Sequence, residues 1–250
     1  MNWTLFKMTL KKNWTLMLIF YGVIAMYQII MVSMYDPDQI DALMAMTQMM
    51  PPEIMKAMGF STMVTDITGY LASWLYGILM FGFPMVYCII LGNRLVAKKV
   101  DNGSFTYFLT TPHSRTEIVS TLGIYSIFSV ILLFLLFFLT GTITCNLAYP
   151  GLLDVSAFFK LNFTTMLVNI TVMMITFASS CIFNEAGLST GFGSGIPILF
   201  ILMYMMGGVS PDSEFIKKIS IFGFYDPVEL IRGASVIVPN IIYLVSSALL

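Results

Sequence analysis

The chain has 250 residues, of which 58% are hydrophobic and 10% charged, and its mean hydropathy is +0.88. A water-soluble domain could not bury so large an apolar fraction, so we predict an all-α membrane protein with one transmembrane domain over residues 1–250. The net charge of −1 excludes the broad basic surface that is typical of nucleic-acid binding.

The residues before the first apolar run carry a helical pattern. Aromatic and apolar side chains recur at helical spacing at Trp3, Phe6, Leu10 and Trp14, and Lys7 and Lys11 lie on a neighbouring face. This pattern predicts an N-terminal helix in the membrane interface, and an aromatic belt at the start of a span is the alternative. No cleavable signal peptide is apparent, so the first span should remain in the mature protein.

Six stretches without Asp, Glu, Lys or Arg are long enough to span a membrane once. About 20 apolar helical residues cross a hydrocarbon core of roughly 30 Å. We predict six spans, at about 14–34, 69–92, 118–140, 161–183, 187–208 and 234–250. The last span stops at Leu250 without a basic tail, as expected of a chain that is cut short.

The Lys and Arg residues next to the spans predict the orientation, because positive residues resist translocation. With both termini in the cytoplasm, the inner segments carry Lys7, Lys11, Lys12, Arg94, Lys98, Lys99 and Arg115, and the outer ones carry Lys56, Lys160, Lys217, Lys218 and Arg232. The first outer loop adds one Lys against five acids, namely Asp36, Asp38, Asp41, Glu53 and Asp66. Both termini are therefore predicted to be cytoplasmic.

Two outer segments have distinctive composition. The loop Asp36–Asp66 is rich in methionine and is interrupted by Pro51-Pro52, which predicts two short surface helices. Its thioethers favour an adaptable apolar interface, with a Cu(I) site as the less favoured alternative. The segment Ser210–Arg232 is too apolar for a solvated loop and too charged for a span, so we expect a short helix pair that dips into the outer leaflet.

Small residues form a strip on the fifth predicted span. Gly187, Gly191 and Gly195 repeat every fourth residue, which lets another helix approach closely. The partner helix could belong to the same chain or to a second subunit, and the pattern favours neither. A phosphate-binding loop is excluded here because no strand precedes the glycines and no GKS or GKT follows them.

Residues that could carry catalysis are scarce. His113 is the only histidine, and there is no GxSxG, HExxH or Walker motif, so we expect no enzyme active site, metal site or cofactor in this chain. Cys88, Cys145 and Cys181 show no CxxC pairing and are interpreted as packing residues. The polar residues within spans include Gln28, Asn169, Thr140, Thr142, Thr144, Thr171 and Thr176. Hydrogen bonding between helices is their more frequent use, and lining of a translocation path is the alternative.

The polar stretch Val100–Glu117 carries clear helix start and stop signals. Asp101-Asn102-Gly103 should end the extension of the second span, and Ser104 can cap a short helix over Phe105–Thr110. Pro112 should end that helix, and Ser114 with Glu117 forms a capping box for the next one. The apolar side chains of Phe105, Tyr107, Phe108 and Leu109 favour insertion into a partner's groove, with a membrane-surface helix as the alternative.

These residues also carry a resemblance. Asp101-Asn102-Gly103-Ser104, then Leu109-Thr110-Thr111-Pro112 and Ser114-Arg115, resemble the signature of type-2 ABC export permeases. The similarity extends to six spans, the amphipathic N-terminal helix, the loop after the second span and a Tyr225-Asp226-Pro227 loop before the sixth. The missing basic tail departs from this pattern.

The resemblance implies a permease in the cell membrane that lacks its own ATPase. It would pair with a second permease copy or relative and with two cytoplasmic ABC ATPase subunits, which bind ATP and Mg. The coupling region 100–117 would contact them through Asp101, Gly103, Ser104, Phe105, Phe108, Leu109, Pro112, Ser114 and Arg115. Glu185, in the turn between the fourth and fifth spans, is a further candidate contact with a cytoplasmic partner, although solvation at the interface is the simpler account.

Alternating access driven by the ATPases would then export a substrate. The uncharged spans favour an amphipathic or hydrophobic substrate, such as a peptide, drug or lipid-like molecule. One alternative is a non-transporting immunity or sensor component that binds a peptide outside and signals through a partner. A secondary carrier is disfavoured because ionisable groups are absent from the spans.

Overall fold

The computed structural model describes residues 2–36, 66–77, 79–106, 113–183, 185–207 and 214–250. Every regular element within these ranges is a helix, which confirms the all-α prediction. The long helices are α1 (Trp3–Met34), α5 (Leu79–Leu95), α8 (Arg115–Ala148), α9 (Val155–Ile182) and α10 (Ala186–Gly207). The shorter ones are α4 (Ile67–Trp74), α6 (Ala97–Asp101), α11 (Glu214–Ile219), η3 (Ile221–Phe224), α12 (Pro227–Ile231) and α13 (Ile237–Leu249).

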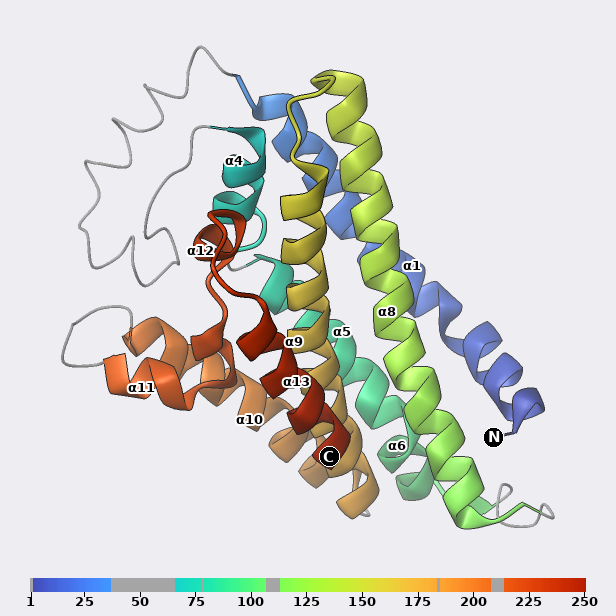
Figure 1. Cartoon of the computed structure of the whole chain (residues 1–250). Coiled ribbons are helices and arrows are strands. Elements are labelled where there is room, and N and C mark those ends of the chain that lie inside the picture. The colour runs from blue at the N-terminus through green and yellow to red at the C-terminus, as the bar shows by residue number, and fades with distance from the viewer. Residues whose placement is uncertain (1, 37–65, 78, 107–112, 184, 208–213) are drawn as a thin grey trace.

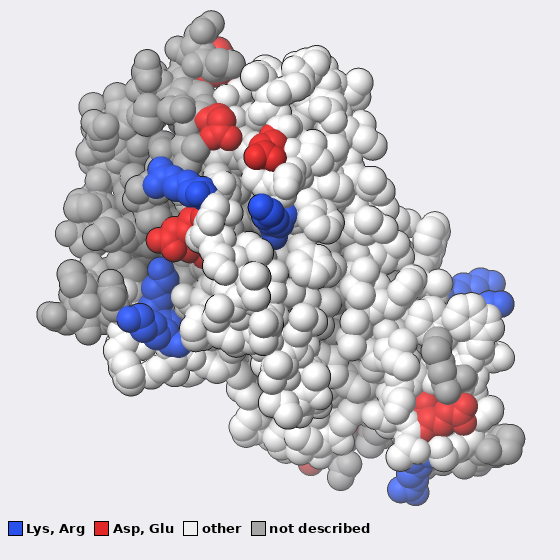
Figure 2. Space-filling view, in the orientation of Figure 1, with Lys and Arg blue, Asp and Glu red and all other residues white. Residues whose placement is uncertain are grey.

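Five of these helices, counting α5 with its continuation α6 as one, are long and apolar enough to cross a membrane. The sixth predicted span, 234–250, is present as α13, whose 13 residues rise only about 20 Å. Figure 2 shows that charged side chains gather toward two ends of the viewed face, with a broad uncharged surface between them. This distribution fits a protein surrounded by lipid.

Helix α1 corrects the prediction of a separate interfacial helix. Residues 3–34 form one continuous helix, because no Pro or Gly interrupts the chain before Gly22. Phe6 is buried and packs edge-on against Tyr125 and Phe128 of α8. Trp3 remains exposed, stacks on Phe6 and lies under the ammonium group of Lys7, while Leu10 packs partly against the core. On the predicted aromatic face, Phe6 therefore packs inside the bundle, whereas Trp3 lies at the protein surface.

Helix α9 is the centre of the bundle and contacts α5, α8, α10, α12 and α13 (Figure 1). Its polar residues serve contacts between helices, as the more frequent use of such residues predicts. Pro84 lacks the N–H that would bond the carbonyl of Met80, and Asn169 Nδ2 of α9 donates to that carbonyl instead, at 3.3 Å. Thr176 Oγ1 similarly donates to the carbonyl of Cys88, at 3.2 Å. Gln28, in contrast, is buried with neither amide atom bonded within the described part of the chain.

The second predicted span is broken. Helix α4 ends at Trp74 and α5 begins at Leu79, with a turn at Leu75–Gly77. Tyr225, from the segment before the last helix, satisfies a backbone carbonyl at this break. Its buried hydroxyl donates to the carbonyl of Tyr76, at 3.2 Å, and lies 2.8 Å from Thr165 Oγ1. The Tyr225-Asp226-Pro227 sequence therefore closes the bundle, because Asp226 also caps α12 and Pro227 occupies its first turn.

The contact of Tyr225 gives a stability prediction. We expect Tyr225→Phe to lower the free energy of unfolding by about 1 kcal/mol, because the buried contacts of its hydroxyl with the Tyr76 carbonyl and Thr165 Oγ1 are lost with little change of shape. Thermal unfolding of purified variants measures this loss. In a double-mutant cycle with Thr165→Val, the two losses should be less than additive, and full additivity would contradict the shared contact.

The predicted short helices before α13 are present as α11, η3 and α12. Phe222, Tyr225 and Val228 are buried within the protein, whereas Phe215 and Ile219 are exposed. Insertion of this segment into the outer leaflet stays a prediction. Ser220 Oγ donates to the carbonyl of Phe200 at 2.7 Å, which ties this segment to α10. The predicted helices of the methionine-rich loop fall in 37–65, outside the described residues, and so does the copper alternative.

The three cysteines are all free. Cys88 and Cys145 are buried, as expected of packing residues. Cys181 is exposed, so the packing interpretation was wrong for it. It lies one residue before the last residue of α9.

Candidate functional site

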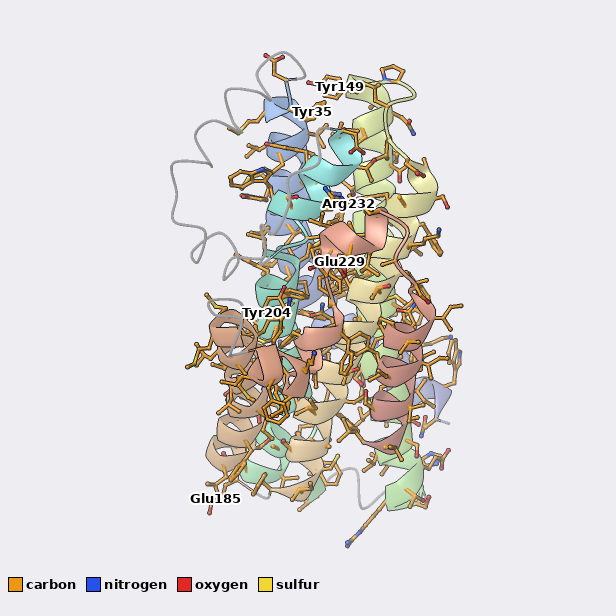
Figure 3. All side chains as sticks on the ribbon, turned by 60° about the vertical axis from the view of Figure 1, so that its left-hand side comes forward. Tyr35, Tyr149, Glu185, Tyr204, Glu229 and Arg232 are labelled. Carbon is orange, nitrogen blue, oxygen red and sulfur yellow. The ribbon has the colours of Figure 1, made fainter. Side chains whose placement is uncertain are left out.

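The site singled out by sequence lies at one end of the bundle. Helix α6, the start of α8 and the junction of α9 and α10 share the lower end in Figure 1, and Glu185 points away from the protein there in Figure 3. We call this the polar end and define it as residues 2–12, 93–106, 113–121, 180–183 and 185–190. The Tyr35–Tyr149 pair, in which the Tyr149 hydroxyl donates to the Tyr35 carbonyl, marks the opposite end (Figure 3).

A tight turn follows α6, at the position that the helix stop signals predict. Gly103 has φ +72°, in the left-handed region that favours glycine. The Phe105 N–H donates back to the carbonyl of Lys99, at 2.8 Å, which satisfies a carbonyl at the helix end. Ser104 donates through its hydroxyl to Asn102 Oδ1 at 2.6 Å. Residues 102–105 therefore form a hydrogen-bonded turn, with Ser104 closing the turn. Most of the predicted helix Phe105–Thr110 lies outside the described residues.

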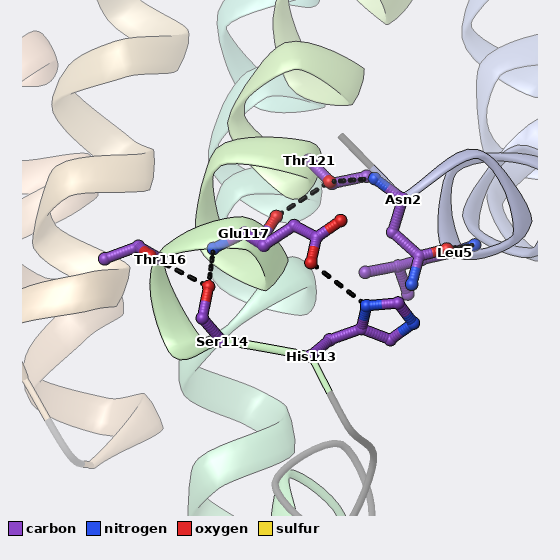
Figure 4. Close-up of polar contacts among 7 residues, drawn as sticks. All are labelled: Asn2, Leu5, His113, Ser114, Thr116, Glu117 and Thr121. Atoms are coloured by element: carbon purple, nitrogen blue, oxygen red, sulfur yellow. Dashed lines mark hydrogen bonds and ion pairs between the residues drawn. The ribbon is translucent and has the colours of Figure 1, made fainter.

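Helix α8 begins with the predicted cap (Figure 4). Ser114 Oγ accepts a hydrogen bond from the Glu117 N–H, at 3.1 Å. The Glu117 carboxylate lies 3.0 Å from His113 Nδ1, a contact that the sequence pattern did not suggest. One half of the capping box is thus confirmed, and the acidic residue in the first turn also suits the positive end of the helix dipole.

Three hydrogen bonds connect the polar end to the long helices. The backbone N–H of Asn2 donates to Thr121 Oγ1 at 2.9 Å, joining α1 to α8 (Figure 4). The Ala97 N–H, at the start of α6, donates to Ser180 Oγ of α9 at 2.7 Å. Asn93 Nδ2 of α5 donates to Thr190 Oγ1 of α10 at 2.5 Å. Sequence reasoning missed all three, because each partner lies more than 80 residues away along the chain.

Apart from Ser104, which is half-buried in the turn, the candidate coupling residues separate into three groups. Asp101, Gly103, Ser114, Arg115 and Glu185 are exposed at the polar end, where a partner could reach them. Phe105 is half-buried and packs against the core, so the expectation of a freely exposed side chain is wrong for it. The turn that returns its N–H to Lys99 is the physical reason. Phe108, Leu109 and Pro112 lie outside the described residues.

The glycine strip faces outward. Gly187, Gly191 and Gly195 are exposed, and a Cβ added to any of them would meet no described atom within 4 Å. Ser189 and Gly193, on the other face of α10, are buried, and an added Cβ on Gly193 would lie 3.3 Å from the Thr176 backbone. In the described part of the chain, the strip therefore does not serve packing within one subunit.

The chemistry available at the polar end is that of binding. The described residues contain no group of three or more His, Cys, Asp or Glu side chains placed to hold a metal ion. The exposed groups, among them Asp101, Arg115 and Glu185, can form ion pairs and hydrogen bonds with a partner.

Comparison with known proteins is consistent with this arrangement. Searches of curated proteins and of solved structures gave no match. The family model described as ABC-2 family transporter protein matches residues 3–228, from the start of α1 into α12. This match covers most of the chain, including the polar end and the Tyr225-Asp226-Pro227 segment. The chain therefore belongs to the ABC-2 family of transporter proteins, as a type-2 ABC transporter permease.

Proposed function

We propose that this chain is the permease of an ATP-driven exporter and that two cytoplasmic ATPase subunits dock on its polar end. The observation that carries the proposal is the hydrogen-bonded connection of the turn after α6 to the rest of the bundle. Through Ala97 and Ser180 the base of α6 is fixed to α9, the central helix. A push on the turn would therefore move α9 and its neighbours together.

The orientation in this proposal places the polar end and the N-terminus in the cytoplasm. Support comes from the cations: Lys7, Lys11, Lys12, Arg94, Lys98, Lys99 and Arg115 all belong to the polar end. Positive residues close to short spans are retained on the cytoplasmic side.

A second permease copy or relative would complete the transporter by packing against α10. Only 17% of the most apolar part of α10 is buried within one chain, compared with 72% for α9. The smooth strip of Gly187, Gly191 and Gly195 lies on this open side and would admit a second helix at close distance.

The proposed substrate is amphipathic or hydrophobic. No Asp, Glu, Lys or Arg of the described residues is buried, so the spans offer no fixed charge to a hydrophilic ion. The same observation supports coupling to ATP hydrolysis in partner subunits rather than to protons carried by this chain.

The turn at Gly103 offers a direct test. We expect Gly103→Val to reduce the ATPase stimulation and transport of the reconstituted complex about tenfold, because a β-branched residue at positive φ costs roughly 1–2 kcal/mol. Gly103→Asn is the matched control, since asparagine adopts this conformation more readily and should retain most activity. ATP turnover and substrate movement in proteoliposomes measure the effect.

Two outcomes would contradict the docking proposal. The first is full transport by both Gly103→Val and Phe108→Asp, the second substitution resting on the sequence alone. The second outcome is an intact complex that turns over ATP without moving any substrate, which would favour the immunity or sensor alternative.

A further inference from the structure

A cavity of about 420 Å³ opens at the polar end, between α5, α6 and α10. It is lined by Ile89, Ile90, Asn93, Arg94, Lys98 and Thr190. This volume falls within the range of sites for small ligands and head groups. The lining combines two isoleucines, one amide, one hydroxyl and two cations, so the cavity has both apolar and cationic walls.

The two cations of the cavity carry charge that the described chain does not neutralise. Within the described residues, neither Arg94 nor Lys98 forms an ion pair with a carboxylate, and the cavity lining contains no acid. Asn93 Oδ1 is also buried without a hydrogen-bond partner in the described chain. Buried polar atoms are normally bonded, so a hydroxyl donor in the cavity would satisfy it. These features point to a ligand that combines an anion with a hydroxyl.

An apolar stripe leads from the cavity along α5. Phe83, Val86 and Ile90 are 41%, 43% and 41% exposed and follow each other at helical spacing. The stripe ends at Arg94, one turn beyond Ile90, where the apolar part of the span also ends. An apolar stripe that ends at unneutralised cations matches the form of a lipid, with acyl chains beside the span and the phosphate at the interface.

We propose that this cavity binds the head group of an anionic phospholipid, with the phosphate between Arg94 and Lys98 and an acyl chain along Phe83, Val86 and Ile90. The planar guanidinium of Arg94, on α5, and the flexible ammonium group of Lys98, on α6, suit a phosphate, because a phosphate accepts hydrogen bonds from several directions. The proposal rests neither on the ATPase docking nor on the direction of transport, although the cavity lies at the same polar end. It would anchor α5 and α10 at the membrane interface through a lipid.

The test measures lipid affinity of the purified full-length chain by native mass spectrometry. Phosphatidylglycerol and phosphatidylcholine with identical acyl chains are the two probes. Because each cation near a membrane surface contributes roughly fivefold, we expect Arg94→Gln/Lys98→Gln to weaken phosphatidylglycerol binding about 30-fold and to leave phosphatidylcholine binding unchanged. Lys160→Gln/Arg232→Gln, which removes the same charge from two exposed residues elsewhere, should retain the wild-type preference.

Several results would overturn the proposal. Equal affinity for the two lipids in the wild-type chain would exclude charge recognition, and equal weakening by both double variants would exclude this cavity as its place. Displacement of phosphatidylglycerol by inorganic phosphate would identify an anion site rather than a lipid site. If the double variant does not fold, Lys98→Gln, at an exposed position, should still weaken phosphatidylglycerol binding about fivefold, and no change would overturn the proposal.

Discussion

Replacing Gly92 with leucine is expected to lower the free energy of unfolding by about 3 kcal/mol, the upper end of the usual cost of overpacking. Helices α5 and α9 meet here without space for a side chain. A Cβ on Gly92 would lie 2.5 Å from Thr176 Oγ1, 2.9 Å from Thr176 Cβ and 3.2 Å from the Thr176 carbonyl carbon. Because the last of these atoms belongs to the backbone, a change of rotamer cannot relieve the clash, and the helices must separate.

Gly82 provides the matched control on the same helix. A Cβ at Gly82 would meet no described atom within 4 Å, so Gly82→Leu should leave stability unchanged or raise it slightly through better helix propensity. Thermal unfolding in one detergent, followed for both variants and the wild type, compares them directly. Equal stability of Gly92→Leu and Gly82→Leu would show that α5 and α9 do not pack as described.

The second large effect concerns association between subunits. Gly191→Leu should leave the fold of one chain intact, because its Cβ faces open space, and should abolish pairing of permeases through α10. Gly193→Leu, two residues away, should do the reverse: its Cβ would press on the Thr176 backbone at 3.3 Å and destabilise the chain itself. The two substitutions are chemically identical, so the difference between them reports only the direction in which each glycine faces.

Analytical ultracentrifugation in detergent separates these outcomes, with unfolding temperatures measured in parallel. We expect a stable monomer for Gly191→Leu and a loss of thermal stability for Gly193→Leu. An unchanged dimer fraction for Gly191→Leu would place the second subunit on another face. The chain would remain an ABC-2 permease in that case, because its family membership does not depend on the strip.

The packing also bears on how the proposed transporter would move. Helix α9 is joined to α5 through Asn169 and Thr176, to α6 through Ser180 and to the segment before α13 through Thr165. These contacts favour displacement of the four elements as one body. Helices α1 and α10, which are mostly exposed, lie at the edges of that body and are the parts able to contact lipid or a second subunit.

Local features of the fold followed from the sequence because their causes are local. Apolar run length predicted the long helices, the Asp101-Asn102-Gly103 run predicted the end of α6, and Ser114 predicted the start of α8. Each of these depends on a few consecutive residues: burial in lipid, a left-handed turn or a side-chain cap. The signature around the same turn was also sufficient to suggest the transporter family.

The tertiary structure decided everything that depends on which faces meet. Sequence placed glycines on both faces of α10 but could not say that Gly193 packs on α9 while Gly191 faces outward, because helical spacing does not distinguish a neighbouring helix from lipid. The sequence also could not show that Phe6 and Phe105 pack inside the bundle. Nor could it show that Asn169 donates to the Met80 carbonyl, which lacks its usual helical partner because residue 84 is a proline. In a membrane, apolar side chains are equally suited to protein and lipid, so hydrophobicity determines where the helices are, and close packing with hydrogen bonding determines how they fit together.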